Sequence, residues 1–233
     1  MARHHNPNIT VSGLGIYIDV NNPRSYDFSL DNPVPQDIKK GVTSTVTLYN
    51  SPTTNEDHID FNGTSHKRIE KDGWKPGSFQ PDYVTSCMWI YPNTNITTGA
   101  NNIITAETSF EVALHRTSST SNYCKILYAS NPWAWRGSSA GVIPVGSWSL
   151  VTFVHGASKA KTYVNDVKTY EQNHSGPLGS GHGSYPYITL MGRYTGTTSR
   201  ARCKFGALYL YDRELSDDEI AQLFYARRGK YNV

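Results

Sequence analysis

The stretch that decides the fold is the C-terminal one, "LYLYDRELSDDEIAQLFYARRGKYNV", residues 208–233. Ser216 followed three residues later by Glu219 is a capping box, which marks the start of a helix. Gly229 is expected to end this helix in the left-handed conformation. We predict a helix over 216–228, too short to be stable alone in water, so that it must pack on the rest of the chain. The apolar residues that would form its docking stripe are spaced at i, i+3 and i+4: Ile220, Leu223 and Phe224.

The chain before this helix is dominated by short strand signals separated by Gly, Pro and Asn. "GLGIYIDV" (13–20) alternates apolar and other residues, and "DYVTSCMWIYPN" (82–93) is apolar on both faces from Cys87 onward. The second pattern is typical of a strand covered on both sides, as in the middle of a stacked pair of sheets. "AKTYVNDVKTYEQ" (160–172) predicts a hairpin that turns at Asn165-Asp166. These signals predict an all-β, antiparallel sandwich with the short helix packed on it.

Length and composition favour one domain and exclude several classes of protein. The chain has 233 residues and shows no linker, so we expect an N-terminal arm (1–12) followed by a single domain (13–233). A net charge of +3 is too small to indicate binding to nucleic acid, and no apolar run reaches the roughly 20 residues of a membrane helix. The N-terminus lacks a signal-peptide pattern, so we expect synthesis in a cytoplasm. The three cysteines are odd in number and widely spaced, which predicts buried, reduced thiols: Cys87, Cys124 and Cys203.

Three local patterns, in this order along the chain, resemble the concanavalin A-like jelly-roll superfamily, specifically its laminin-G-like branch. They are "GLGIYIDVNNPRSY" (13–26), "GSWSLVTFVHGASKAKTYVNDVKTYE" (146–171) and "LMGRYTG…KFGALYLYDRELSDDEI" (190–220). "IDFNGTS" (59–65) is also similar to a strand of that family. In the second pattern Asp166 stands where the family usually has Gly. The resemblance implies a jelly-roll β-sandwich in which the terminal helix closes the fold.

Such domains occur in bacteriophage structural proteins, and this resemblance implies the leading function. The chain is expected to be a non-catalytic virion protein, such as a capsid decoration protein, a head fibre or a tail-associated module. It would act through contacts with capsid or other virion proteins and would form homo-oligomers, with no cofactor. Its location would be the virion, after synthesis in the host cytoplasm.

Catalysis has little support in the sequence. Some relatives in the superfamily are glycoside hydrolases, which need two carboxylates about 5–9.5 Å apart. The clustered pattern Glu-x-Asp-x-x-Glu of those relatives is missing, and Glu107 and Glu111 lack the intervening acid. We therefore predict no catalytic residue and no metal ligand. The one alternative for a cofactor is calcium, because "NEDHID" (55–60) offers oxygen ligands and many laminin-G-like relatives bind calcium.

The alternative function is recognition of cell-surface glycans, and it rests on closely spaced aromatic residues. In "NPWAWRG", Trp133 and Trp135 are two residues apart, so an extended segment would point both rings the same way, with Arg136 beside them. "HGSYPY" places Tyr185 and Tyr187 at the same spacing. Such rings suit stacking on a pyranose, but rings in this pattern more often fill a core or the centre of a protein interface.

A basic segment provides a second set of candidates. "GRYTGTTSRARCK" (192–204) concentrates four cations in what we expect to be one loop, either solvated or docked on an acidic protein surface. They are Arg193, Arg200, Arg202 and Lys204.

Overall fold

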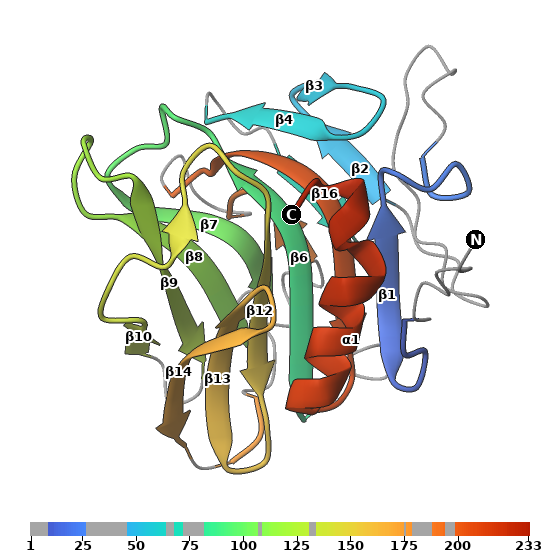
Figure 1. The fold of residues 1–233 in the computed structure, drawn as a ribbon, viewed down its shortest axis with the longest axis vertical. Helices are drawn as coiled ribbons and strands as arrows, with labels where there is room; N and C mark the ends of the chain where they lie inside the picture. Colours follow the sequence, from blue (N-terminus) through green and yellow to red (C-terminus); the bar gives the residue numbers. More distant parts are fainter. Residues whose placement is uncertain are drawn as a thin grey trace, which may run out of the picture.

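Two antiparallel sheets form the body of the molecule in the computed structural model, with one helix lying against the outside of the first (Figure 1). The structure describes residues 9–26, 46–63, 68–71, 82–106, 109–130, 134–174, 176–178, 188–193 and 199–233. The first sheet, sheet A, contains in spatial order β14 (Val167–Asn173), β13 (Lys159–Val164), β12 (Ser149–His155), β6 (Val84–Pro92), β16 (Arg202–Tyr211), β4 (Ile59–Asn62) and β3 (Thr53–Thr54). Strand β1 (Leu14–Asp19) also pairs with β16. The predicted sandwich is confirmed.

The second sheet, sheet B, is built largely from the middle of the chain. It contains in spatial order β10 (Ala134–Gly137), β9 (Tyr123–Ser130), β8 (Phe110–Arg116), β7 (Gly99–Ala106), β15 (Ile188–Leu190), β5 (Arg68–Lys71) and β2 (Val46–Tyr49). The two-residue strand β11 (Ile143–Pro144) pairs with β9. Every strand pairing in both sheets is antiparallel.

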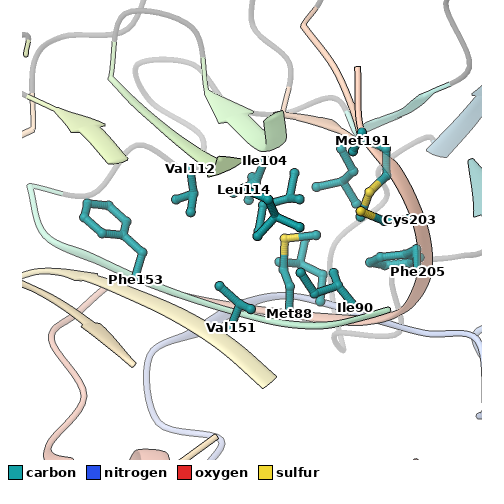
Figure 2. Close-up of a cluster of buried hydrophobic side chains, with 14 of the residues drawn as sticks. Met88, Ile90, Ile104, Val112, Leu114, Val151, Phe153, Met191, Cys203 and Phe205 are labelled. Atoms are coloured by element: carbon teal, nitrogen blue, oxygen red, sulfur yellow. The ribbon is translucent and has the colours of Figure 1, made fainter. Parts of the chain in front are cut away.

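The main core lies between the two sheets, where inward side chains from alternate strand positions meet. Figure 2 shows Met88, Ile90, Val151 and Phe153 of sheet A opposite side chains of sheet B, among them Val112. All five are at most 2% exposed. Because side chains alternate along a strand, these positions also fix which residues of each sheet point outward.

Strand β6 is covered on both sides, as predicted, but its second cover is the helix and not another sheet. Cys87 and Trp89 point outward from sheet A into a second apolar cluster. Helix α1 (Asp217–Arg227) lies over this face, as Figure 1 shows. The Trp89 ring stacks on Tyr231 at 4.2 Å and on Phe224 at 5.9 Å. The predicted helical stripe is buried in the same cluster: Ile220, Leu223 and Phe224.

The start of α1 follows its sequence signals, whereas its end does not. Ser216 accepts a hydrogen bond from the Glu219 backbone N–H, and the Glu219 side chain accepts one from the Ser216 N–H, so the capping box is present. The prediction that Gly229 would end the helix in the left-handed conformation is wrong. The chain continues into a 3₁₀ turn, η1 (Arg228–Lys230), and the left-handed residue is Asn232, with φ of 56°. No helix in the described part of the chain has the length and apolar character needed to cross a bilayer.

A buried polar network joins the end of the helix to the N-terminal strand. The Asp19 carboxylate accepts a hydrogen bond from the Tyr17 hydroxyl at 3.0 Å. Arg227 donates to that hydroxyl at 2.7 Å, and its guanidinium lies 3.8 Å from Asp19. Since Asp19 is only 1% exposed, its charge depends on these partners. The N-terminal motif "GLGIYIDVNNPRSY" therefore has a structural role, which is to hold the terminal helix.

Two further predictions concern the hairpin and the arm. The hairpin β13–β14 is confirmed, with Asn165 at φ of 60° and its side chain accepting a hydrogen bond from the Leu150 N–H at 3.0 Å. Ile9 and Thr10 of the expected arm contact the domain itself. Ile9 contacts the helix-covered cluster, and the Thr10 carbonyl accepts a hydrogen bond from the Tyr211 hydroxyl.

Candidate functional site

Of the aromatic residues proposed from the sequence, the structure describes Trp135. It lies on edge strand β10, in register with Ala129, and is 41% exposed. Arg136 follows it and is in register with Tyr128, whose ring belongs to the core, so Arg136 faces the other side of the strand. Arg136 and Trp135 thus point to opposite sides of β10, whereas the expected pair of tryptophan rings stays a prediction. The other three residues of this set lie outside the described residues: Trp133, Tyr185 and Tyr187.

Two of the four basic residues expected in one loop lie in a strand of sheet A. The backbone of Arg200 forms an isolated β-bridge with Asn102 of sheet B. Arg202 and Lys204 belong to strand β16 of sheet A, where they are in register with β4. The chain thus crosses from one sheet to the other within this segment. Arg202 and Lys204 therefore belong to a strand and not to one loop with Arg193 and Arg200.

Arg193, the first of these cations, takes part in a buried polar cluster on the outer face of sheet B. Its guanidinium donates two hydrogen bonds to Glu111, one from Nε at 3.0 Å and one from Nη2. Asn102 donates to the same carboxylate oxygen at 2.8 Å and to the Thr105 hydroxyl at 3.2 Å. The Glu111 side chain is 3% exposed, and its carboxylate is held by Arg193 and Asn102. Glu107, its proposed partner, lies beyond the described ranges.

A different set of side chains crosses the outer face of sheet A, and we call it the outer row: Trp148, Tyr91, Lys204 and Asp60. Lys204 is in register with Tyr91 on one side and with Asp60 on the other. Each of the three is flanked by a core residue in its own strand, so all point outward. Trp148 directly precedes β12, and its ring meets that of Tyr91 edge-on at 5.8 Å. All four side chains are half-buried and therefore remain open to solvent on one side.

Contacts within the outer row fix its geometry. The Lys204 ammonium lies 4.9 Å from the centre of the Tyr91 ring, a cation–π arrangement. The Asp60 carboxylate accepts a hydrogen bond from the Asn93 amide at 2.9 Å. Because three of the four side chains belong to hydrogen-bonded strands, their relative positions are set by the sheet. The row thus presents two aromatic rings, a cation and a carboxylate on a rigid base.

The row lies where the cover over sheet A ends. Tyr231, in the C-terminal turn, is buried between Trp89 and Trp148, at 4.2 Å and 4.9 Å between ring centres. A Cβ at Gly206 would lie 2.5 Å from the Tyr231 ring, so glycine allows this ring to approach the sheet. One side of the Trp148 ring therefore packs on Tyr231 of the terminal segment. Trp148 is thus the member of the outer row that adjoins the covered face.

The acidic segment at 55–60 does not bring its carboxylates together. Asp57 lies 2.5 Å from the His58 imidazole, whereas Asp60 is bound to Asn93. Within the described ranges, no group of three or more His, Cys, Asp or Glu side chains is arranged to hold a metal ion. Calcium binding at this segment stays an untested prediction.

The buried titratable groups are structural. The prediction of buried, unpaired cysteines is confirmed for all three. Burial raises the pKa of Cys87 to about 12 and that of Cys124 to about 11, so neither is a thiolate at neutral pH. At one end of the sandwich the His155 ring stacks on His174 at 4.0 Å, and burial together with this neighbour lowers the pKa of His155 to about 4.

The sequence indicates the side of the strand on which Tyr91 and Trp148 lie, but not that their rings meet. Alternation in "CMWIYPN" places Tyr91 on the same side as Trp89, and alternation in "GSWSL" places Trp148 with Leu150. What brings the rings together is the register of β6 with β12 and β16, which pairs residues far apart in the chain. No local pattern in the sequence records that register.

Comparison with known families and structures gives a consistent result for the fold. The sequence profile described as "Concanavalin A-like lectin/glucanases superfamily" matches residues 53–221, which is more than half of the chain. No curated protein matches the sequence.

Among solved structures, the ligand-binding domain of botulinum neurotoxin serotype D in complex with N-acetylneuraminic acid has a TM-score of 0.61 and 13% identity, over 91% of this chain and 50% of that one. The serotype G binding domain has a TM-score of 0.62 and 11% identity, over 92% and 51%. This chain thus spans about half the length of the neurotoxin domains. Domain 4 of the extracellular GH43 arabinanase AbnA from Geobacillus stearothermophilus, in complex with arabinotriose, has a TM-score of 0.57 and 15% identity, over 91% and 98%. At these identities the likeness concerns the fold alone.

Proposed function

The chain belongs to the concanavalin A-like lectin/glucanases superfamily, and we propose that it is a non-catalytic saccharide-binding module. The observation that carries this proposal is the outer row on sheet A, in which two aromatic rings stand beside a cation and a carboxylate. Saccharides are bound by ring faces that stack on the apolar side of a pyranose and by polar groups that reach its hydroxyls. The row contains both kinds of group.

The row also has the rigidity that a shallow site requires. Lys204 and Asp60 lie on paired strands, and each makes a second contact, with the Tyr91 ring and with Asn93 respectively. Side chains that are already ordered lose less conformational entropy when a ligand binds. The opposite side of Trp148 is packed against Tyr231, which fixes the plane of its ring.

Two of the structures with a similar fold were solved with saccharides, one with N-acetylneuraminic acid and one with arabinotriose. These ligands belong to those proteins, but they support the choice of saccharides as the class to test. The proposal is non-catalytic because Asp60 is the one carboxylate of the row, whereas glycoside hydrolysis uses two.

The test is binding of the purified protein to a panel of neutral saccharides that includes arabinotriose, lactose and chitotriose, in calcium and then in chelator. We expect binding to at least one of them and a loss of about tenfold or more in Tyr91→Ala and Lys204→Ala. Trp135→Ala is the matched control, because its ring lies on the other sheet. Thermal unfolding of each variant establishes that a loss of binding is not a loss of folding.

The outcomes separate the possibilities. Loss of binding in Trp135→Ala, with Tyr91→Ala unaffected, would move the site to the tryptophan motif identified in the sequence. Loss of binding in chelator would support calcium at residues 55–60. A panel without any binding would contradict the proposal.

A second role, as a virion protein that acts through protein contacts, keeps one structural observation in its favour. Val167 at the tip of the hairpin is 61% exposed, and Tyr225 on the adjacent helix is 45% exposed and donates to Asp166 at 2.7 Å. This small apolar patch is a reasonable contact surface for capsid proteins or for a second copy. Light scattering after size-exclusion chromatography tests the homo-oligomer, and Val167→Asp should then weaken it.

A further inference from the structure

The outward side of strand β9 carries an exposed aromatic ring at each end. Cys124 and Ile126 point into the core, so the residues between them and on either side face outward. Tyr123 at one end is 52% exposed, and Trp135, in register with Ala129 at the other end, is 41% exposed. Ala129 lies six positions after Tyr123, which corresponds to about 20 Å along the strand.

The surface between these rings is basic. Lys125 lies on the outward side of β9, in register with His115 on β8. Arg200 forms an isolated β-bridge with Asn102 on β7, which places its backbone beside this surface. We call Tyr123, Lys125, His115 and Trp135 the β9 stripe, with Arg200 at its margin.

The described carboxylates do not neutralise these cations. Glu111, on the same face, is already held by Arg193 and Asn102. In the part of the chain that the structure describes, Lys125 and Arg200 form no ion pair.

We propose that the β9 stripe is a second binding site, which takes an extended acidic oligosaccharide. Its sugar rings would stack on Tyr123 and Trp135, and its carboxylate or sulfate groups would pair with Lys125 and with Arg200 at the margin. Carboxylates and sulfates share the chemistry that the stripe recognises, a negatively charged oxygen group. The site lies on the opposite sheet from the outer row, so it does not depend on the function proposed for that row.

The spacing of the stripe favours a saccharide over a nucleic acid. Single-stranded nucleic acids are held by aromatic rings that stack successive bases in a strongly basic groove. Here the two rings are about 20 Å apart along the strand. The chain as a whole carries a net charge of only +3.

The test uses the full chain and four probes: a heparin-derived hexasaccharide, a hyaluronan hexasaccharide, neutral chitohexaose and an oligothymidylate of matched charge. We expect one or both acidic oligosaccharides to bind, with an affinity that falls as salt is added. Heparin binding would identify sulfate as the recognised group, and hyaluronan binding would identify carboxylate. Lys125→Ala and Tyr123→Ala should each weaken binding by about fivefold.

Lys168→Ala is the matched control, because Lys168 is a lysine on the β13–β14 hairpin of sheet A. An equal loss in this control would overturn the proposal, since it would mean that total charge and not the stripe attracts the probe. The proposal would also be overturned if Lys125→Ala and Tyr123→Ala weakened binding of chitohexaose or of the oligothymidylate as much as binding of the acidic oligosaccharides. Failure of this test leaves the outer row untouched, because that row is tested with neutral saccharides and with Tyr91→Ala.

Discussion

The outer faces of the two sheets differ in polarity and in what covers them. On sheet A the face is apolar, and the helix and Tyr231 cover it, so that Trp89 is fully buried on a surface that would otherwise face water. On sheet B the corresponding face is polar, with Glu111 held by Arg193 and Asn102. One sheet is therefore stabilised by apolar burial on both sides, and the other by apolar burial on one side and paired polar groups on the other.

This difference shows where ligand-binding groups remain available. On sheet A they lie beyond the end of the helical cover, where Tyr91 and Lys204 are half-buried. On sheet B they lie toward the edge, at Trp135 and on the outward side of β9. On sheet A these groups lie beyond the helix and Tyr231, and on sheet B they lie beside the paired polar groups around Glu111.

The largest effect is expected on the covered face. Trp89→Ala removes a fully buried ring that stacks on Tyr231 and Phe224, so we expect a loss of about 3–5 kcal/mol in the free energy of unfolding. Urea unfolding measures it. Trp135→Ala is the matched control and should change stability by less than about 0.5 kcal/mol, because that ring is exposed. Similar losses in both variants would mean that the helix does not cover a second core.

A smaller loss is expected on the polar face. Arg193→Ala leaves the buried Glu111 carboxylate with Asn102 as its remaining partner of the cluster, which should cost about 2–3 kcal/mol. Adding Glu111→Gln should recover part of this loss, since a neutral amide is less costly to bury than a charge. Arg202→Ala removes an exposed contact to the Asn95 carbonyl and serves as the control. No recovery in the double variant would contradict the buried-charge explanation.

The end of the sandwich, where the two sheets meet, should respond to acid. His155 of β12 contacts Ser130 of β9 at 3.3 Å, and its pKa is lowered to about 4. The unfolded chain takes up this proton near pH 6.5, before the folded chain does. Stability should therefore fall as pH drops from about 6.5 to about 4, by up to about 1.4 kcal/mol per pH unit, and this contribution should not fall further below pH 4. Denaturant unfolding at several pH values measures the slope. An unchanged slope in His155→Gln would exclude this residue as its cause.

The sequence was sufficient for features that depend on neighbouring residues. The capping box at Ser216, the turn at Asn165 and the two-faced burial of β6 are local, and all are confirmed. The sequence was misleading where residues that are close along the chain belong to different elements of the fold. The segment from Arg193 to Lys204 looks like one basic loop, yet it contributes to both sheets because the chain crosses between them.

The outer row illustrates the same limit for the candidate site. Tyr91, Trp148, Lys204 and Asp60 come from four separate segments, and only strand register places them together. Register depends on long-range pairing, which no short motif encodes. Trp135, by contrast, was visible as part of a short aromatic motif, and its exposure agrees with a surface role.

The most direct measurement is the set of tryptophan indole N–H signals in an NMR titration of the protein with arabinotriose, lactose and chitotriose, assigned with single Trp→Phe variants. The described tryptophans report on three regions: Trp148 on the outer row, Trp89 on the covered face and Trp135 on the edge of sheet B. We predict that a bound neutral saccharide shifts the Trp148 signal and leaves the signals of Trp89 and Trp135 in place. A shift of Trp135 with Trp148 unchanged, or no shift with any of the three saccharides, would contradict the assignment of the outer row as the binding site.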